Sequence, residues 1–249
     1  MHWTLVEQIQ TDRVEVIDAE AHHLLHVLRC KPGSELVLFD GMGHVADAVV
    51  ESVTRRSVVC SVVRRSAMGR PWAGGLTVAV SPPKGDRLRW MVEKLTELGV
   101  QTIKLLRCAR TVTDPGDTRL EKLRSTAAAA CKQSRRAWLP EIEPFSDLRV
   151  LVEQVPVGEM LYLAHPPADL SGGLSPGILE PQPQVSAGPA IASGSSPVKK
   201  LLLIGPEGGF TEEELGTAIV AGGQLIHWPH SVLRTETAAI VFSALLLRG

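Results

Sequence analysis

Residues 201–215 read LLLIGPEGGFTEEEL and carry three structural signals within one short segment. An apolar run ends abruptly at Gly205-Pro206, which is typical of a buried strand followed by a turn. Thr211 and Glu214 have the spacing of a capping box, so a helix is expected to begin directly after the loop. The segment therefore predicts a strand, a tight loop and a helix. Open α/β sheets bind ligands outside the carboxyl ends of their strands, which is where this loop falls.

The loop itself narrows the class of ligand. Gly208 and Gly209 carry no side chain, so backbone groups can approach a ligand closely. The spacing matches neither of the two common glycine-rich phosphate loops. Glu207 would repel a phosphate but tolerate a cationic group, so an adenosine-like ligand with a positive centre fits better than a nucleotide di- or triphosphate. An ordinary strand-to-helix turn is the alternative for this loop taken alone.

A second polar cluster stands near the end of the chain. Residues 231–239 read SVLRTETAA, and residues 240–247 are almost wholly apolar, which predicts a helix buried nearly all round. Thr235 and Thr237 are ordinary helix-capping residues in such a position. The arginine and the glutamate of the cluster stand two residues apart and have no capping role, so they are candidates for a function.

Length and composition describe a globular chain of one large or two ordinary domains. The 249 residues are 44% hydrophobic and 21% charged, and no apolar run reaches about 18 residues, so no membrane span is expected. The first ten residues lack the pattern of a signal peptide. The four cysteines are isolated, without metal-ligand or redox spacing, which suits a reducing, cytoplasmic location: Cys30, Cys60, Cys108 and Cys131.

Charge is distributed unevenly along the chain. Residues 1–136 contain 21 Lys and Arg against 15 Asp and Glu, whereas residues 137–249 contain 5 against 12. A basic region in a nearly neutral chain indicates a local anionic partner such as nucleic acid. A solvated charged surface explains the same composition equally well.

Periodicity divides the chain into two parts. Short strand patterns at 14–17, 35–40, 45–53 and 57–63, with one helix at 20–29, predict a small barrel or sandwich. Residues 66–75 contain three Gly and one Pro and are expected to form a linker. Strands then alternate with helices, which predicts an α/β domain with a mainly parallel sheet: strands 76–80, 100–106, 159–165, 201–204 and 222–228, and helices 87–99 and 118–136. Residues 167–197 are rich in Gly, Pro, Ser and Ala and predict a flexible excursion.

GPEGGFTEEEL and VLRTETAA together resemble the uracil-N3 methyltransferases of 16S ribosomal RNA, a family in the SPOUT class of knotted methyltransferases that use S-adenosylmethionine. HHLLHVLR at 22–29 and KGDRLRWMVEKLTELGV at 84–100 agree with that family. The resemblance implies a PUA-like β-barrel that binds RNA over residues 1–68. It also implies a SPOUT α/β methyltransferase domain over residues 76–249, with a C-terminal trefoil knot, and a homodimer.

The resemblance also implies site residues. Arg234 would stabilise negative charge on the uracil, and Glu236 would orient Arg234 or accept a proton, unless it merely fixes the loop. Eleven residues would hold the cofactor: His165, Pro166, Ile204, Gly205, Glu207, Gly208, Gly209, Trp228, Val232, Leu233 and Thr237. Six would contact RNA: Arg29, Lys84, Arg87, Arg110, Arg124 and Arg136. No metal site is expected, since the histidines at 22, 23 and 26 have no suitably spaced Cys or carboxylate partners.

Three departures from the family pattern leave other functions open. Lys132 and Arg135 replace an acidic residue and a glycine, which makes the helix at 118–136 more basic and fits an RNA-facing surface. Ser231 replaces an arginine. A non-catalytic RNA-binding module that has lost cofactor affinity is therefore one alternative. A ribose 2′-O-methyltransferase of the same class is the other, although the barrel-first order and LRTETAA favour the uracil family.

Overall fold

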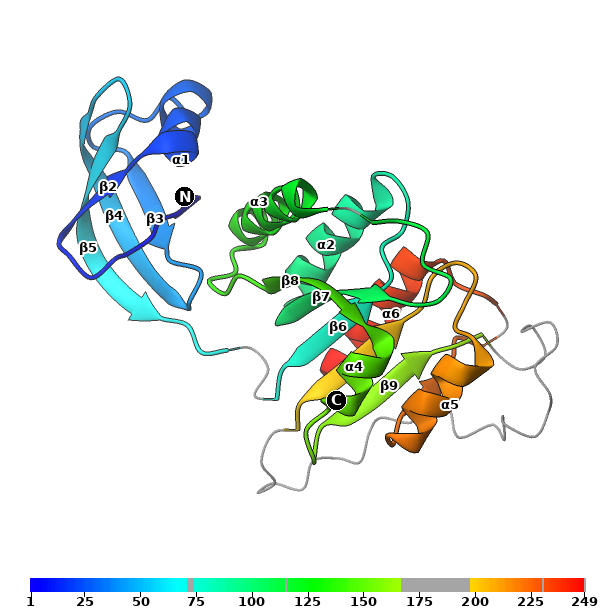
Figure 1. Ribbon diagram of the computed structural model, residues 1–249. Helices are drawn as coiled ribbons and strands as arrows, with labels where there is room; N and C mark the ends of the chain where they lie inside the picture. The colour runs from blue at the N-terminus through cyan, green and yellow to red at the C-terminus, as the bar shows by residue number, and fades with distance from the viewer. Residues whose placement is uncertain (71–73, 115, 167–197, 230, 249) are drawn as a thin grey trace. The chain divides into compact units, whose positions relative to one another are not determined.

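The computed structural model describes residues 1–70, 74–114, 116–166, 198–229 and 231–248 (Figure 1). The chain forms two compact units: an N-terminal unit of residues 1–71 and 127–139, and a C-terminal unit of residues 72–126 and 140–249. The excursion predicted for residues 167–197 and the middle of the predicted linker lie outside the described residues. Within those residues, no helix is both long and apolar enough to cross a membrane.

The N-terminal unit is built on a curled five-stranded sheet in the order β1-β3-β4-β5-β2. Its strands are β1 (His2–Leu5), β2 (Arg13–Val16), β3 (Glu35–Phe39), β4 (His44–Val53) and β5 (Val58–Ala67). β1 runs parallel to β3 and the other pairs are antiparallel. The β4–β5 register shifts twice, and such irregularities bend a strand pair and help to curl the sheet. Because β5 continues to Ala67, the linker predicted from residue 66 begins later than expected.

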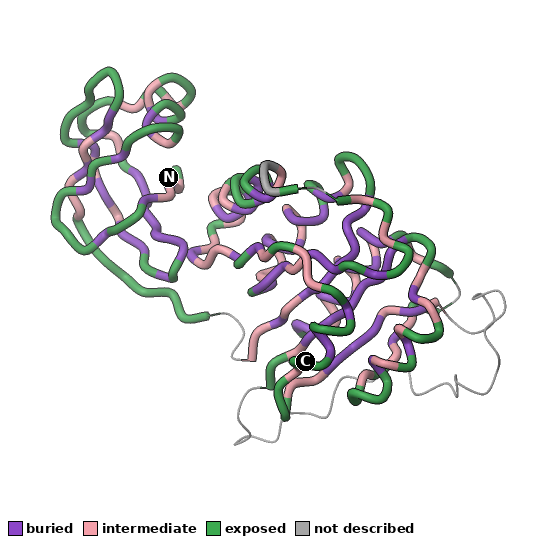
Figure 2. The backbone as a smooth tube through the Cα atoms, viewed as in Figure 1, coloured by how far each residue is buried: buried purple, intermediate pink, exposed green. Residues whose placement is uncertain are grey.

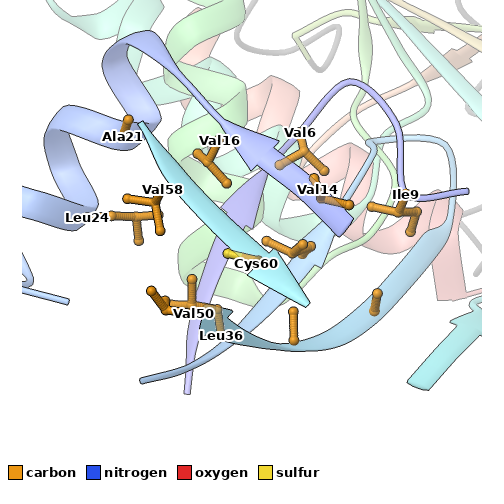
Figure 3. Packing of buried hydrophobic residues seen from close by; sticks show 13 residues of the cluster. Val6, Ile9, Val14, Val16, Ala21, Leu24, Leu36, Val50, Val58 and Cys60 are labelled. Carbon is orange, nitrogen blue, oxygen red and sulfur yellow. The ribbon is translucent and has the colours of Figure 1, made fainter. Parts of the chain in front are cut away.

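One face of this sheet carries a hydrophobic cluster, shown close up in Figure 3. Val14 and Val16 alternate with exposed neighbours along β2, as a half-buried strand requires. α1 (Asp18–His22) and the π-helical turn η1 (His23–Val27) cover the cluster through Ala21 and Leu24. The single helix predicted at 20–29 is therefore two short elements.

A second cluster of the N-terminal unit includes residues far along the sequence. Val37, Phe39 and Val45 pack with Cys131 and Ala137, and Leu139 packs against them. The Nε1 of Trp138 also donates a 2.8 Å hydrogen bond to the carbonyl of Met68. Residues 127–139 thus complete this unit, although they lie outside the range 1–68 expected for the N-terminal domain.

The C-terminal unit contains a fully parallel six-stranded sheet in the order β11-β9-β10-β6-β7-β8. Its strands are β6 (Leu76–Val80), β7 (Thr102–Arg107), β8 (Glu141–Asp147), β9 (Met160–Ala164), β10 (Lys200–Ile204) and β11 (Gln224–Ile226). Its helices are α2 (Arg87–Leu98), α4 (Leu148–Glu153), α5 (Glu212–Val220) and α6 (Thr235–Arg248), and the division between the units falls inside α3 (Asp117–Ser134). α2 and α6 cover one face and α4 and α5 the other (Figure 1).

The apolar run of β10 explains its central position. A strand with helices on both faces buries nearly all its side chains, and in Figure 2 the residues of the central strands are coloured mainly as buried. Leu201 and Leu203 join a cluster with Phe210 and Leu215 on the α5 side. The predicted strand, loop and helix are confirmed, including the capping box between Thr211 and Glu214.

Two elements of this unit were absent from the sequence prediction. Among the described strands, β8 pairs with β7 alone and forms one edge of the sheet, where Pro144 is tolerated because an edge strand has unpaired backbone groups. The proline and the acidic residues hid the strand from the apolar pattern. α4 follows β8 at once and has only six residues, so it shows no helical period.

Candidate functional site

The carboxyl ends of four parallel strands meet at one edge of the C-terminal sheet. Ile204 of β10 lies level with Val80 of β6 and Ala164 of β9, and Ala164 lies level with Ile226 of β11. The first residues beyond the strands continue this arrangement, since the Ser81 amide donates to the Ile204 carbonyl at 2.9 Å. The strand order places β10 between β9 and β6, whereas the strands that follow β6 in the sequence, β7 and β8, lie on the other side of β6. This is the kind of topological switch point at which a ligand crevice opens.

The loop after β10 is a tight turn whose glycines differ in role. A Cβ on Gly205 would lie 3.2 Å from the Phe210 ring, so a side chain here would require the ring to shift by a few tenths of an ångström. Gly209 has φ +70°, which favours glycine, and no atom of the described residues lies within 4 Å of the position of its missing Cβ. Beside Gly208, in contrast, the Arg110 side chain lies 3.3 Å from the Cβ position. Open space for a ligand is therefore found at Gly209 and not at Gly208.

Hydrogen bonds join the loop after β7 to this glycine loop and to the first turn of α5. Arg110 Nη1 donates to the Gly208 carbonyl at 2.6 Å and to the Phe210 carbonyl at 3.4 Å. In the opposite direction, Glu214 Oε1 accepts a 2.7 Å hydrogen bond from the Ala109 amide. The other oxygen of Glu214 accepts from the Thr211 amide at 2.8 Å. One carboxylate thus caps α5 and fixes the neighbouring loop, which keeps the glycine loop in one shape.

The start of α6 meets the glycine loop directly. The hydroxyl of Thr235 is buried and donates to the Gly205 carbonyl at 3.3 Å. The Ala238 amide donates to the Arg234 carbonyl at 2.8 Å, which places Arg234 at the helix N-terminus. Its side chain is exposed and has no hydrogen-bond or ion-pair partner in the described part of the chain. The two sequence motifs therefore form one site.

Glu236 lies in the first turn of α6 and is buried. Its Oε2 has no hydrogen-bond partner among the described residues, and its described ion-pair partner is Arg87, whose Nη1 lies 3.5 Å away. Arg87 also donates from Nη2 to Glu207 Oε1 at 3.2 Å. Arg87, predicted as an RNA contact, is thus engaged with the two carboxylates of the candidate site.

His165 follows β9 at the same edge and is buried. Its Nδ1 lies 2.8 Å from the Pro166 carbonyl oxygen, and because a carbonyl can only accept, Nδ1 carries the proton. Nε2 remains an acceptor. Burial lowers the pKa of His165, and His227 nearby lowers it further, so the ring is neutral at neutral pH.

The other predicted cofactor residues lie on the same loops. Ile204 is buried at the end of β10, where it anchors the glycine loop. Trp228 and Val232 are exposed on the connection from β11 to α6. Leu233, near the end of that connection, and Thr237, in the first turn of α6, are partly buried. The described residues contain no group of three or more His, Cys, Asp or Glu side chains that could hold a metal ion.

The predicted RNA-binding residues are dispersed. Arg29 is exposed in the N-terminal unit, and Lys84 is exposed between β6 and α2. Arg124 is exposed on α3 but pairs with Glu121 and donates to the Ile142 carbonyl at 3.2 Å. Arg136 is half-buried, and burial lowers the pKa of its guanidinium.

Lys132, one of the basic residues expected on an RNA-facing surface, forms an ion pair within the N-terminal unit. Its Nζ lies 2.6 Å from Glu20 Oε1, and only about a quarter of each side chain is exposed. The positive charge of Lys132 is therefore paired with the Glu20 carboxylate within the N-terminal unit. Sequence shows the charge of Lys132 but not the distant residue that neutralises it.

A separate cavity of about 350 Å³ lies at the carboxyl ends of β7 and β8. It is lined by residues 107–109, 147–149 and three side chains of α5, among them Glu214. Burial raises the pKa of Cys108, which lines this cavity, to about 12, so it is no thiolate nucleophile. The cavity is lined by Ala109 and Glu214, which are hydrogen-bonded to each other beside the glycine loop, but its lining includes neither Glu236 nor His165.

Comparison with known proteins identifies the two units. An RNA methyltransferase domain family matches residues 71–247, and an RNA methyltransferase PUA domain family matches residues 16–63. The protein named Ribosomal RNA small subunit methyltransferase E of Mycobacterium bovis is 32% identical to this chain, and the match covers 93% of this chain and 85% of the relative. The protein of the same name from Bacillus subtilis is 29% identical, and the match covers 92% of this chain and 90% of the relative.

A solved structure supports the same assignment. A Legionella pneumophila protein in complex with the bound cofactor SAM is 27% identical, with a TM-score of 0.77 over 99% of this chain and 96% of that one. The predicted fold class, a PUA-like domain followed by a SPOUT-type α/β methyltransferase domain, is confirmed. The chain belongs to the RNA methyltransferase family that includes Ribosomal RNA small subunit methyltransferase E.

Proposed function

We propose that this chain transfers the methyl group of S-adenosylmethionine to N3 of a uracil in 16S ribosomal RNA. The observation that carries the proposal is the contact of Thr235 with the Gly205 carbonyl, which joins the two sequence motifs at the carboxyl edge of the sheet. The names of the curated relatives support the RNA substrate, and the Legionella structure supports the cofactor.

The residues at this edge fit S-adenosylmethionine. Space is open at Gly209, and residues 205–210 carry the Glu207 carboxylate and no Lys or Arg of their own that could bind a polyphosphate. The buried Glu236 Oε2 has no hydrogen-bond partner among the described residues, so it could accept a hydrogen bond from a ligand. The loops at 204–209 and 228–233, with His165 and Pro166, would hold the cofactor, and Leu233 and Thr237 would complete its site. The cofactor supplies an electrophilic methyl group on a positively charged sulfur.

Arg234 would act on the RNA base. Its guanidinium is exposed at the N-terminus of α6, where the helix dipole also favours negative charge. Loss of the N3 proton places negative charge on the uracil oxygens, which a planar guanidinium can bind with two parallel donors. Pre-positioned charge of this kind stabilises the transition state more than the ground state.

Methylation of uracil at N3 requires a group that accepts the N3 proton. N3 of uracil carries a proton at neutral pH, and this proton must leave as the new N–CH₃ bond forms. The Glu236 carboxylate is the candidate acceptor, because it is ionisable, lies two residues from Arg234 and has an oxygen without a described hydrogen bond. An alternative role, fixing the loop through Arg87, involves the same carboxylate.

We further propose that the basic residues of the N-terminal unit and α3 bind the RNA backbone. We also propose that each chain contains a C-terminal trefoil knot and that two copies of the chain form a dimer. These proposals rest on the family resemblance and on the excess of Lys and Arg in residues 1–136. Light scattering at several concentrations tests the dimer, since a monomer at micromolar concentration would refute it.

A methyl-transfer assay tests the proposed function. The protein is incubated with methyl-labelled S-adenosylmethionine and unmodified small-subunit RNA, free and assembled into subunits, with large-subunit RNA as the control. Label should enter small-subunit RNA and not large-subunit RNA. Absence of transfer to both forms, with RNA binding retained and no cofactor binding in calorimetry, would favour a non-catalytic RNA-binding module.

A further inference from the structure

Three segments distant in sequence meet at one guanidinium. Arg87 is the first residue of α2, Glu207 lies in the loop after β10, and Glu236 lies in the first turn of α6. Arg87 Nη2 donates to Glu207 Oε1 at 3.2 Å, and Nη1 lies 3.5 Å from Glu236 Oε2. The third nitrogen, Nε, donates to the Lys84 carbonyl at 3.2 Å. All three guanidinium nitrogens are therefore engaged within the protein.

The burial of the three side chains is unequal. The Glu236 side chain is 6% exposed, whereas Arg87 is 36% and Glu207 43% exposed. A carboxylate as buried as Glu236 needs a nearby cation, because an unpaired buried charge is costly. Arg87 supplies that charge in the described part of the chain. The ion pair between Arg87 and Glu207 is partly exposed, so it adds little to stability and mainly fixes the positions of the two side chains.

The location of this cluster links it to the proposed reaction. α2 begins beyond the carboxyl end of β6, and the Glu207 loop begins at the adjacent end of β10. α6 packs against α2 and against both strands. Arg87 thus connects the glycine loop with the helix turn that follows Arg234.

We propose that Arg87 is a positioning residue for methyl transfer, which rests on the function proposed above. Its guanidinium holds the Glu236 carboxylate and the Glu207 loop in one arrangement, and it does not serve as a phosphate contact. A planar fork can serve two carboxylates and a carbonyl together, whereas the ammonium of lysine is a single point of charge.

The test compares Arg87→Gln and Arg87→Lys with Arg89→Gln, a matched control. Arg89 is exposed on the same helix and has no ion-pair partner in the described part of the chain. A positioning role predicts that Arg87→Gln lowers kcat on the order of 10- to 100-fold, with the KM for RNA changed less than about twofold. Arg87→Lys should recover only part of the loss, and Arg89→Gln should behave like the wild type.

RNA binding at several salt concentrations separates this role from a phosphate contact. A lost phosphate contact would weaken RNA binding and reduce the salt dependence by about one counterion, with kcat retained. That result for Arg87→Gln would overturn the proposal. An unchanged salt dependence with reduced kcat supports it.

A double-mutant cycle separates positioning from a purely structural role. If Arg87 acts through Glu236, the variant carrying both Arg87→Gln and Glu236→Gln should be no slower than Glu236→Gln alone. Additive losses, or a lowered melting temperature with turnover per folded molecule unchanged, would refute the proposal. If the wild type itself transfers no methyl group, the proposed function fails, whereas an active wild type with an equally active Arg87→Gln refutes the role of Arg87 alone.

Discussion

Arg110 Nη1 lies 2.6 Å from the carbonyl oxygen of Gly208, so a side chain from the loop after β7 holds the glycine loop after β10. The same side chain fills the space beside Gly208, where a Cβ would lie 3.3 Å from Arg110 Cδ. The glycine loop is thus shaped by a cation that sequence alone marks as a candidate RNA contact. The shape of this loop, and with it the cofactor site, should depend on Arg110.

Substitution of Arg110 by alanine should weaken S-adenosylmethionine binding about tenfold. A hydrogen bond from a charged donor contributes about 1.5–3 kcal/mol, and exposure reduces this to roughly the 1.4 kcal/mol of a tenfold change. Calorimetric titration measures the affinity. Lys122→Gln, an exposed cation of α3, is the control and should leave it unchanged. Normal cofactor affinity in Arg110→Ala, with weaker RNA binding, would instead make Arg110 an RNA contact.

Two glycine-to-alanine changes should have opposite effects on stability. Gly205→Ala places a methyl group 3.2 Å from the Phe210 ring, and overpacking of a buried site costs about 1–3 kcal/mol. Gly216→Ala lies inside α5 with nothing within 4 Å, so it should stabilise the protein by about 0.5–1 kcal/mol. Thermal melting compares both variants with the wild type. Equal melting temperatures for the two would show that the turn tolerates a side chain.

His165 should make stability depend on pH. Burial lowers its pKa below the ordinary value of 6.5, so the unfolded chain binds the proton more readily than the folded one. Stability is therefore lost as pH falls through about 6.5 toward the lower pKa of the folded state, by at most about 1.4 kcal/mol per pH unit. His165→Asn keeps a donor for the Pro166 carbonyl but cannot titrate. Urea unfolding at pH 7.5 and 5 should show a smaller loss for this variant, and an identical loss would contradict the account.

Arg234→Lys should separate catalysis from binding. It keeps the charge at the start of α6 but loses the planar fork of donors, so turnover and catalytic efficiency should fall together on the order of 10²-fold. Cofactor affinity and melting temperature should change little, because the side chain is exposed and has no described partner. Single-turnover methylation measures the rate. Normal turnover would exclude Arg234 from the mechanism, and early melting with all activities lost would make it structural.

Local patterns predicted most of the secondary structure of the C-terminal unit. β10 is a continuous apolar run and α5 begins with a capping box, and both signals lie within a few residues. α2 ends at Gly99, whose φ of 91° suits glycine at a helix end. β8 escaped because Pro144 interrupts it, and an edge strand needs no continuous apolar pattern.

Contacts between distant residues escaped the sequence prediction. The second cluster of the N-terminal unit joins Phe39 to Cys131 and Ala137, and no local period reveals such a pairing. The same holds for the candidate site. Sequence predicted the two motifs, but it did not show that Arg87 pairs with Glu236 or that Arg110 donates to the Gly208 carbonyl, because a charge shows neither its partner nor its direction.

Identification of the methylated nucleoside tests the central claim most directly. Small-subunit RNA is treated with the protein and S-adenosylmethionine, digested completely to nucleosides and separated by liquid chromatography with mass spectrometry. The account predicts a new 3-methyluridine, absent when the cofactor is omitted and strongly reduced with Arg234→Lys. A nucleoside methylated on the ribose, or on a base other than uracil, would contradict it.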